Sequence, residues 1–484
     1  MTDSIANSQS NSVVTRPLVG ISFGLLSRLL NFLILPISLH IFTPQDFLKL
    51  SWFAILATGV STVSGLGLQS QITNLILQQY RNEGNLFYRL LKSMTLFWII
   101  ELIFLTMFYQ YLIPHFKYLP LWVFVLAAID GILQSMQIDL FSCFLQVKNQ
   151  TNKTYLLGIL LAFVLGPLRI LIIFATGPDT MLWFGVGVFF RLFVLIISGF
   201  IIHRLVTRSK NQSSTLGTKI SILSKQSFFI LFGVQFWLLI TFDKYLVSKL
   251  FTAIDASGYQ AAFQFASILS LIYVQINFAI HSKQIEYADS PALGRYLDRE
   301  IWMMLTSSFF FTGLIYLGVF IFIPDGYEST IEILPVLILT HFFYFPIPIW
   351  ISIHARINEK GHLAWLIPTF GVITAFVITI IVYTHIQCTL DVAIISAVSM
   401  LTSVCFGLWL DSKLAGGIIC KAIFNLKNVV AILCFLITQI ASLSWVSPLE
   451  ALVFGALLCL VGLPLMIGAA IRLGRFSSTN TLTI

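Results

Sequence analysis

The chain has 484 residues, of which 58% are hydrophobic and only 10% are charged, and its net charge is +8. A soluble domain carries roughly a quarter of charged residues, so this composition excludes a water-soluble globular protein and indicates a protein solvated by lipid. The six cysteines form no C-x-x-C pair and have no histidine at metal-ligand spacing, which argues against a disulfide framework or a zinc site.

Fourteen apolar stretches follow one another along the chain, each long enough to cross ~30 Å of hydrocarbon. The first follows a polar tail and lacks a small-residue cleavage site, so we interpret it as an uncleaved helix. The predicted transmembrane helices are 17–42, 47–66, 91–113, 120–142, 155–176, 181–203, 227–250, 259–280, 301–323, 331–354, 363–384, 391–410, 428–446 and 449–471. The predicted fold class is therefore all-α, a polytopic membrane protein with about 14 transmembrane helices.

The lysines and arginines predict the orientation of these helices. If the N-terminus is cytoplasmic, 21 of the 28 Lys and Arg residues fall in cytoplasmic segments and three, Lys49, Lys117 and Lys249, on the opposite side. Cytoplasmic loops carry such an excess of positive charge. We therefore expect both termini in the cytoplasm, and we interpret the positive net charge as a topology signal without a nucleic-acid partner.

A polar stretch from Thr207 to Gln226 separates the first six helices from the next six. Phe42-Thr43-Pro44-Gln45-Asp46 and Phe251-Thr252-Ala253-Ile254-Asp255 occupy the first hairpin of each half. Repeats of six helices are parallel, so we predict two parallel six-helix lobes around a central cavity. The predicted domains are a cytoplasmic tail (1–16), an N-lobe (17–206), a cytoplasmic linker (207–226), a C-lobe (227–412), a cytoplasmic loop (413–427), a C-terminal hairpin (428–471) and a cytoplasmic tail (472–484).

Charged residues inside the predicted helices are candidate functional residues, because a charge at mid-bilayer costs at least a few kcal/mol. They are Arg28, Glu101, Asp130, Arg169, Arg191, Asp243 and Lys244, with Asp139 nearer a helix end. Two interpretations stay open for them. They either pair with one another as struts between helices or line a water-filled cavity; those near a helix end can also pair locally or extend to the membrane surface.

The cations among these residues, Arg28, Arg191, Arg169 and Lys244, favour an anionic substrate. A guanidinium presents a fork of donors suited to phosphate oxygens and stays ionised when it is desolvated. The carboxylates Asp130, Glu101 and Asp243 are candidates for charge pairing in the empty state or for proton exchange during turnover. A pump for cationic drugs would favour carboxylates and aromatic residues instead.

Prolines predict where two of the helices bend, and the motifs that the sequence lacks argue against an enzyme. Gly166-Pro167 and the prolines Pro335, Pro346 and Pro348 predict bends in helices 155–176 and 331–354. The sequence has no phosphate-binding Gly-Lys-Ser/Thr loop and no H-E-x-x-H motif. Its outer segments are too short for a catalytic domain, so we expect a transporter and not an enzyme.

Three local patterns resemble the polysaccharide-exporter branch of the multidrug/oligosaccharidyl-lipid/polysaccharide (MOP) flippase superfamily, of which O-antigen repeat-unit flippases are typical. They are Ser27-Arg28-Leu29-Leu30-Asn31-Phe32 running to Phe42-Thr43-Pro44-Gln45-Asp46-Phe47, Gly65-Leu66-Gly67-Leu68, and Phe242-Asp243-Lys244-Tyr245 running to Gly258-Tyr259. The resemblance extends over the whole chain, although Leu48 stands where that branch commonly has a small residue.

The resemblance implies a flippase in the bacterial cytoplasmic (inner) membrane that serves lipopolysaccharide biosynthesis. Its substrate would be an undecaprenyl-pyrophosphate-linked oligosaccharide, moved to the outer leaflet by alternating access with H⁺ or Na⁺ as the coupling ion. Arg28 would be the first candidate for headgroup contact, followed by Arg191, Arg169 and Lys244. Membrane lipids and other polysaccharide assembly proteins would be its partners.

Three alternatives remain open. A flippase for the peptidoglycan lipid precursor shares the expected fold, and a multidrug or cation antiporter belongs to the same superfamily. A membrane enzyme of glycan polymerisation is disfavoured by the short outer segments.

Overall fold

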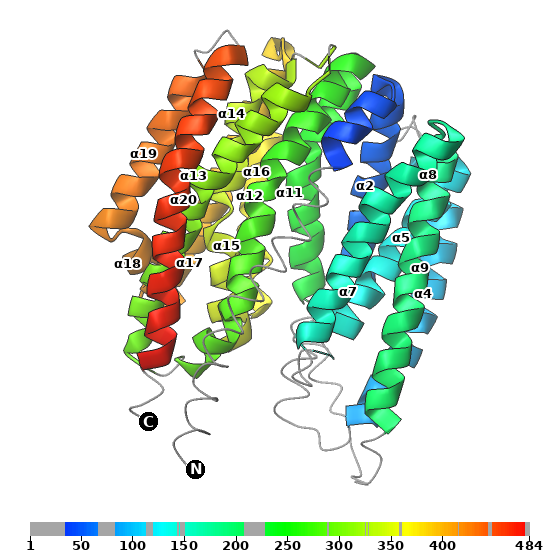
Figure 1. Cartoon of the computed structure of the whole chain (residues 1–484), viewed down its shortest axis with the longest axis horizontal. Helices are drawn as coiled ribbons and strands as arrows, with labels where there is room; N and C mark the ends of the chain where they lie inside the picture. Colours follow the sequence, from blue (N-terminus) through cyan, green and yellow to red (C-terminus); the bar gives the residue numbers. More distant parts are fainter. Residues whose placement is uncertain are drawn as a thin grey trace. The chain divides into compact units, whose positions relative to one another are not determined.

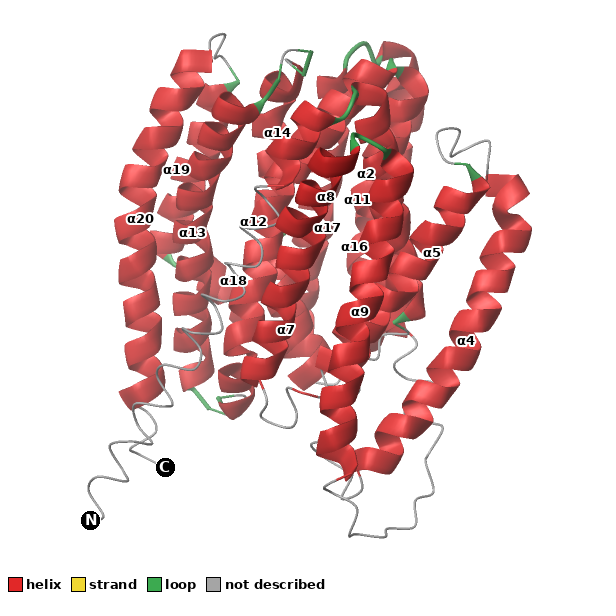
Figure 2. Cartoon of the chain, turned by 45° about the vertical axis from the view of Figure 1, so that its right-hand side comes forward, coloured by secondary structure: helices red, strands yellow, loops and turns green. Residues whose placement is uncertain are grey.

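The computed structural model describes residues 34–65, 83–112, 120–142, 145, 151–207, 228–287, 290–324, 326–327, 329–357, 361–414, 416–443 and 448–479. Every regular element within these ranges is helical (Figure 2), as the sequence predicts. Ten of the described helices are long and apolar enough to cross a membrane, and two shorter ones, Met94–Met107 and Leu426–Ser442, are also apolar. Most of the first predicted helix, 17–42, lies outside the described residues.

Two compact units make up the chain, and their boundary falls inside a single helix. The N-terminal unit holds Ile41–Tyr245 and Gly361–Leu366. The C-terminal unit holds Leu246–Lys360, Ile367–Ile484 and the described residues before Ile41. The predicted linker, 207–226, lies outside the described residues except for Thr207, so a lobe boundary there stays a prediction.

The N-terminal unit is a bundle of helices (Figure 1), and two of its short segments are π-helical. Its elements are α2 (Pro44–Ser64), α4 (Glu83–Leu112), α5 (Leu121–Ser135), η2 (Met136–Ser142), α7 (Thr151–Phe163), η3 (Val164–Leu168), α8 (Arg169–Thr176), α9 (Thr180–Thr207), the first part of α11 (Phe228–Leu250) and η5 (Gly361–Leu363). Pro167 lies inside η3. Since proline removes a backbone donor, the predicted irregularity at this point takes the form of a π-helical turn.

Burial in this unit follows the two faces of α9. One face carries Val194 and Ile202, which are fully buried in an apolar cluster with residues of α4, α7 and η2. The other face carries Phe189, Phe193, Ile196 and Phe200, all between 49% and 64% exposed. Exposed aromatic and aliphatic side chains at this spacing are the surface that a membrane helix turns toward lipid.

The C-terminal unit contains the remaining helices. They are the end of α11, α12 (Ala253–Glu286), α13 (Ala292–Phe322), α14 (Ser329–Phe343), α15 (Pro346–Trp350), η4 (Ile351–Ile357), α16 (Leu366–Val382), η6 (Tyr383–His385), α17 (Thr389–Leu414), α18 (Ile418–Ile423), α19 (Leu426–Ser442) and α20 (Pro448–Thr479). The predicted helix 331–354 is divided into α14, α15 and the π-helical η4, and the division falls at Pro346 and Pro348. Pro335 is accommodated inside α14.

Helices α19 and α20, the predicted C-terminal hairpin, both pack on α13 (Figures 1 and 2). Glycines allow the backbones of α13 and α20 to approach closely. A Cβ added to Gly462 would lie 2.5 Å from the backbone nitrogen of Phe310, and one added to Gly313 would lie 2.7 Å from the carbonyl oxygen of Gly455. Small residues at a crossing of this kind are typical of helix association in membranes.

The sequence repeat corresponds to a shared helix cap. The hydroxyl of Thr43 donates to Oδ2 of Asp46 at 2.8 Å, and the Asp46 amide donates back to that hydroxyl at 3.3 Å. Thr252 and Asp255 repeat this arrangement at the start of α12, with distances of 2.7 and 3.3 Å. In both cases a Thr hydroxyl satisfies an amide that has no partner inside the helix.

Candidate functional site

Asp130 and Arg191 form an ion pair between neighbouring helices of the N-terminal unit. Asp130 lies in α5 and Arg191 near the middle of α9, and the two helices pack against each other. Nε of Arg191 donates to Oδ1 of Asp130 at 2.7 Å. The side chains are 12% and 10% exposed, respectively, so both charges are largely withdrawn from solvent. Pairing of opposite charges is how a membrane interior tolerates them.

Arg169 is held beside this pair by a different set of contacts. It begins α8 directly after the π-helical turn at Pro167. Its Nε donates to the carbonyl oxygen of Trp183 at 2.7 Å, its Nη2 donates to the same oxygen, and its Cζ lies 4.0 Å from the centroid of the Trp183 ring. Gly187, one turn further along α9, leaves room for the guanidinium, since a Cβ there would lie 2.9 Å from Cζ.

These three residues make one cluster, which we call the arginine cluster (Asp130, Arg169 and Arg191). Arg169 interacts electrostatically with both Asp130 and Arg191. With both arginines and the aspartate ionised, the cluster has two positive charges and one negative charge and is therefore net positive. Within the described part of the chain, the terminal amino groups of Arg191 have no protein partner. The cluster can therefore donate further hydrogen bonds to an anion.

Glu101 lies in α4 and has different partners from Asp130. Its Oε2 accepts a hydrogen bond of 2.6 Å from the Ser64 hydroxyl at the end of α2. Nε1 of Trp98 donates to the Ser64 carbonyl at 3.1 Å, which fixes that helix end against α4. Glu101 is 9% exposed, and among the described residues no cation pairs with it.

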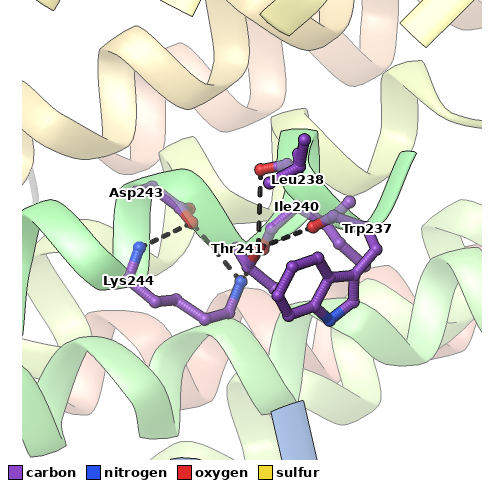
Figure 3. A network of polar contacts seen from close by, with 6 residues as sticks. All are labelled: Trp237, Leu238, Ile240, Thr241, Asp243 and Lys244. Atoms are coloured by element: carbon purple, nitrogen blue, oxygen red, sulfur yellow. Dashed lines mark hydrogen bonds and ion pairs between the residues drawn. The ribbon is translucent and has the colours of Figure 1, made fainter. Parts of the chain in front are cut away.

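Lys244 and Asp243 form a local pair near the end of α11 (Figure 3). Nζ of Lys244 donates to the carbonyl of Ile240 one turn earlier and lies 3.4 Å from Oδ1 of Asp243. The Lys244 side chain is 2% exposed and the Asp243 side chain 3%. The charge of Lys244 is thus balanced by its sequence neighbour, as the open alternative of local pairing predicts.

Arg28, the first candidate for headgroup contact, lies outside the described residues. Of the remaining candidates, the structure brings Arg169, Arg191 and Asp130 together. It places Glu101 and the Asp243–Lys244 pair in separate polar contacts.

Three buried ionisable residues of the C-terminal unit are not among the candidates predicted from the sequence. Glu300 in α13, His354 in η4 and Asp411 in α17 are all fully buried. Nε2 of His354 lies 2.8 Å from Oδ1 of Asp411, whose Oδ2 accepts from the Cys420 amide at 2.9 Å. These residues stand just outside or at the end of the apolar stretches 301–323, 331–354 and 391–410. α13 begins before the stretch 301–323, and α17 ends after the stretch 391–410. For α13, the helix-forming segment 292–300 with its Leu and Tyr residues is the sequence signal that could have revealed the extension.

The chain was compared with protein families, with curated proteins and with solved structures, and only the solved structures gave matches. No model of a known protein family matches the chain, and no curated protein matches it. A mutant of the Vibrio cholerae MATE transporter VcmN is 13% identical with a TM-score of 0.58, over 86% of this chain and 98% of the transporter. The lipid II flippase MurJ in its inward closed conformation is 14% identical with a TM-score of 0.53, over 92% of this chain and 100% of the flippase. The chain has the fold of the MOP transporters.

A third solved structure of this fold differs in the polarity of its binding pocket. A MOP superfamily transporter from Pyrococcus furiosus is 10% identical with a TM-score of 0.56, over 84% of this chain and 96% of that protein. It is described as having a binding pocket of reverse polarity that suggests a different function. At these identities the similarity is one of fold, so the charges of each protein must be read from its own residues.

Proposed function

We propose that the protein is a flippase for an anionic, lipid-linked oligosaccharide. The substrate is an undecaprenyl-pyrophosphate-linked repeat unit of a surface polysaccharide such as O-antigen. It moves from the inner to the outer leaflet of the bacterial cytoplasmic membrane by alternating access, coupled to H⁺ or Na⁺. The arginine cluster is the observation behind this proposal. Its net positive charge suits a pyrophosphate, and so do the donors of Arg191 that have no partner among the described residues.

The fold neighbours are compatible with this proposal. MurJ is a flippase for lipid II, and other neighbours are MATE transporters. Because these neighbours carry different substrates, the charges of this chain distinguish between them, and its arginines favour a phosphorylated headgroup over a cation.

Transport by the purified full-length protein tests the proposal. The protein is reconstituted in liposomes with a fluorescent undecaprenyl-pyrophosphate-linked oligosaccharide, and translocation is followed by quenching with an impermeant reductant. Loss of a hydrogen bond to a charged group is worth about 1.5–3 kcal/mol, so we expect Arg191→Gln to lower the transport rate by about tenfold to a hundredfold.

Two control variants accompany Arg191→Gln. The first tests whether slow transport results from the unpaired charge of Asp130, and the second tests whether it results from the loss of any positive charge. The double variant Asp130→Asn/Arg191→Gln leaves no unpaired carboxylate and should remain as slow as Arg191→Gln. Lys49→Gln removes one positive charge from a half-buried pair with Asp46, outside the arginine cluster, and should leave transport unchanged. Normal transport by a stably inserted Arg191→Gln variant would contradict the proposal.

A multidrug or cation antiporter is the second candidate. It is favoured by Glu101, a buried carboxylate without a cationic partner among the described residues. In that case the liposomes would accumulate a fluorescent cation, and Glu101→Gln would abolish the uptake while Arg191→Gln would not.

Gene deletion distinguishes the two anionic substrates. Loss of surface polysaccharide in viable cells supports the repeat unit as substrate. Loss of viability supports the peptidoglycan precursor instead, which carries the same pyrophosphate linkage.

A further inference from the structure

The C-terminal unit buries a carboxyl group, that of Glu300, that has a single hydrogen-bond partner among the residues that the structure describes. Glu300 lies in the third turn of α13 and is 0% exposed. Its Oε2 accepts a hydrogen bond of 2.7 Å from Nε2 of Gln284 in α12. Its Oε1 is buried and has no hydrogen-bond partner among the described residues. The group is thus enclosed by protein on every side and only half satisfied.

The orientation of the Gln284 amide is set by two other side chains. Oε1 of Gln284 accepts a hydrogen bond of 2.5 Å from the Ser352 hydroxyl in η4. Nε2 of Gln284, which binds Glu300, also donates to Oδ1 of Asn277 at 3.1 Å. The amide nitrogen therefore faces Glu300, and Glu300 is connected through Gln284 to the π-helical segment η4.

Described charged groups on the elements around α13 have partners other than Glu300. Arg299 donates to the carbonyl of Arg472 in α20, Lys427 of α19 binds Asp298, and His354 of η4 binds Asp411 of α17. Two further groups are His341 of α14, whose ring packs on Phe263, and Lys421 of α18, which is exposed. No described cation is placed to neutralise Glu300.

Burial without a countercharge restricts the state of this group. An isolated ionised carboxylate in a low-dielectric interior costs several kcal/mol even after relaxation, whereas the neutral acid loses far less on burial. One amide donor at Oε2 does not compensate a full negative charge. The arrangement is consistent with a carboxyl group whose remaining oxygen, Oε1, carries a proton.

We propose that Glu300 is a proton-binding site of the C-terminal unit, with the proton on Oε1 in this conformation. Loss of the proton would leave a negative charge beside Gln284, so other donors would have to reach Glu300 or the α12–α13–η4 contact would have to open. Because Ser352 holds the far side of the same amide, such a change would act on η4. The role of this proton in a transport cycle rests on the proposed function, whereas its binding does not.

Infrared difference spectroscopy of the purified full-length protein without substrate tests the proposal. The difference between the wild-type and Glu300→Gln spectra should contain the carbonyl band of one protonated carboxyl, while any band of another buried carboxyl, such as Glu101, cancels. Asp298→Asn is the matched control, since this carboxylate lies two residues earlier in α13 and forms an ion pair with Lys427. It should keep the band. If Glu300→Gln fails to fold, Glu300→Asp should move the band to another frequency.

Thermal unfolding at several pH values gives a second measurement. The unfolded chain releases the Glu300 proton at a lower pH than the folded protein does, so raising the pH favours unfolding. The unfolding midpoint of the wild type should therefore fall, and that of Glu300→Gln should fall less. A spectrum of Glu300→Gln that has the same protonated-carboxyl bands as the wild type, with none lost, overturns the proposal. A second outcome also overturns it: the wild-type midpoint depends on Na⁺ at constant pH and ionic strength, and this dependence is lost in Glu300→Gln. A metal ion, and not a proton, would then neutralise Glu300. Neither outcome depends on the substrate, so transport of the lipid-linked oligosaccharide stands or fails separately.

Discussion

Nε of Arg191 lies 2.7 Å from Oδ1 of Asp130, and only about a tenth of either side chain is exposed. Each charge makes the burial of the other tolerable, so the pair stabilises the packing of α5 on α9 only while both members are present. Removal of one partner from a buried pair costs about 3–5 kcal/mol. The ion pair thus has a structural role. Because Arg191 uses only one of its nitrogens for Asp130, its other nitrogens can still donate hydrogen bonds to an anion.

A double-mutant cycle on this pair should show strong coupling. We expect Asp130→Asn to destabilise the N-terminal unit by about 3 kcal/mol, because Arg191 is left without a countercharge. The double variant Asp130→Asn/Arg191→Gln should recover most of this loss. Chemical unfolding in detergent micelles measures both, and additive effects of the two substitutions would show that the pair is not coupled.

Gly187→Ala should displace Arg169 without altering any charge. The new methyl group would lie 2.9 Å from Cζ of Arg169, so the guanidinium has to leave the carbonyl and ring of Trp183. We expect slower transport of the anionic substrate and a change in the emission of Trp183.

Gly185→Ala is the control for this substitution. It lies two residues earlier in α9, where a Cβ meets nothing within 4 Å. It should leave transport and emission unchanged, and its effect on stability should be favourable if anything, because Ala has the higher helix propensity. Equal effects of Gly185→Ala and Gly187→Ala would refute the steric explanation.

The all-helical fold could be predicted from composition and hydropathy because lipid allows few backbone structures. Thirteen of the fourteen predicted stretches coincide with described helices, and the first lies mostly outside the described residues. Proline positions also predicted irregular turns, since η3 contains Pro167 and η4 follows Pro346 and Pro348.

Contacts between helices could not be predicted in the same way. Asp130 and Arg191 are 61 residues apart, and their pairing depends on how α5 and α9 are rotated against each other. Hydropathy gives the length of a helix but says little about its rotation. It also defines a span by its apolar middle, so Glu300, directly before the apolar stretch 301–323, was not among the candidates although α13 begins at Ala292.

Cys420 should react slowly with thiol reagents. Burial, together with the nearby carboxylate of Asp411, raises the pKa of the Cys420 thiol, which lies in α18 between two longer helices. A raised pKa leaves less thiolate at pH 8, and the thiolate is the reactive form. Alkylation at this pH, followed by peptide mass spectrometry, should label Cys388, which is exposed, well before Cys420. Asp411→Asn should speed the labelling of Cys420.

The paired threonine caps should contribute equally to their helices. Thr43→Ala and Thr252→Ala each remove a hydroxyl that accepts from an aspartate amide at 3.3 Å. We expect each to cost about 1 kcal/mol of stability. Thr58→Ala removes an exposed hydroxyl that bonds to a carbonyl inside α2, and it should cost less. A cap effect at only one of the two sites would mean that the repeat has no common structural basis.

Gly462→Ala should loosen α20 from α13. Its Cβ would lie 2.5 Å from the backbone nitrogen and 2.7 Å from the Cα of Phe310, and backbone cannot move aside as a flexible side chain can. The helices have to separate, so we expect a loss of about 1–3 kcal/mol, the usual cost of overpacking. Gly468→Ala lies further along α20, where a Cβ meets nothing within 4 Å, and it should be neutral or slightly stabilising. A cysteine pair bridging α13 and α20 away from Gly462 measures the separation directly. Its crosslinking should slow in Gly462→Ala and stay unchanged in Gly468→Ala, and an unchanged rate in both would show that α20 does not depend on this glycine for its packing.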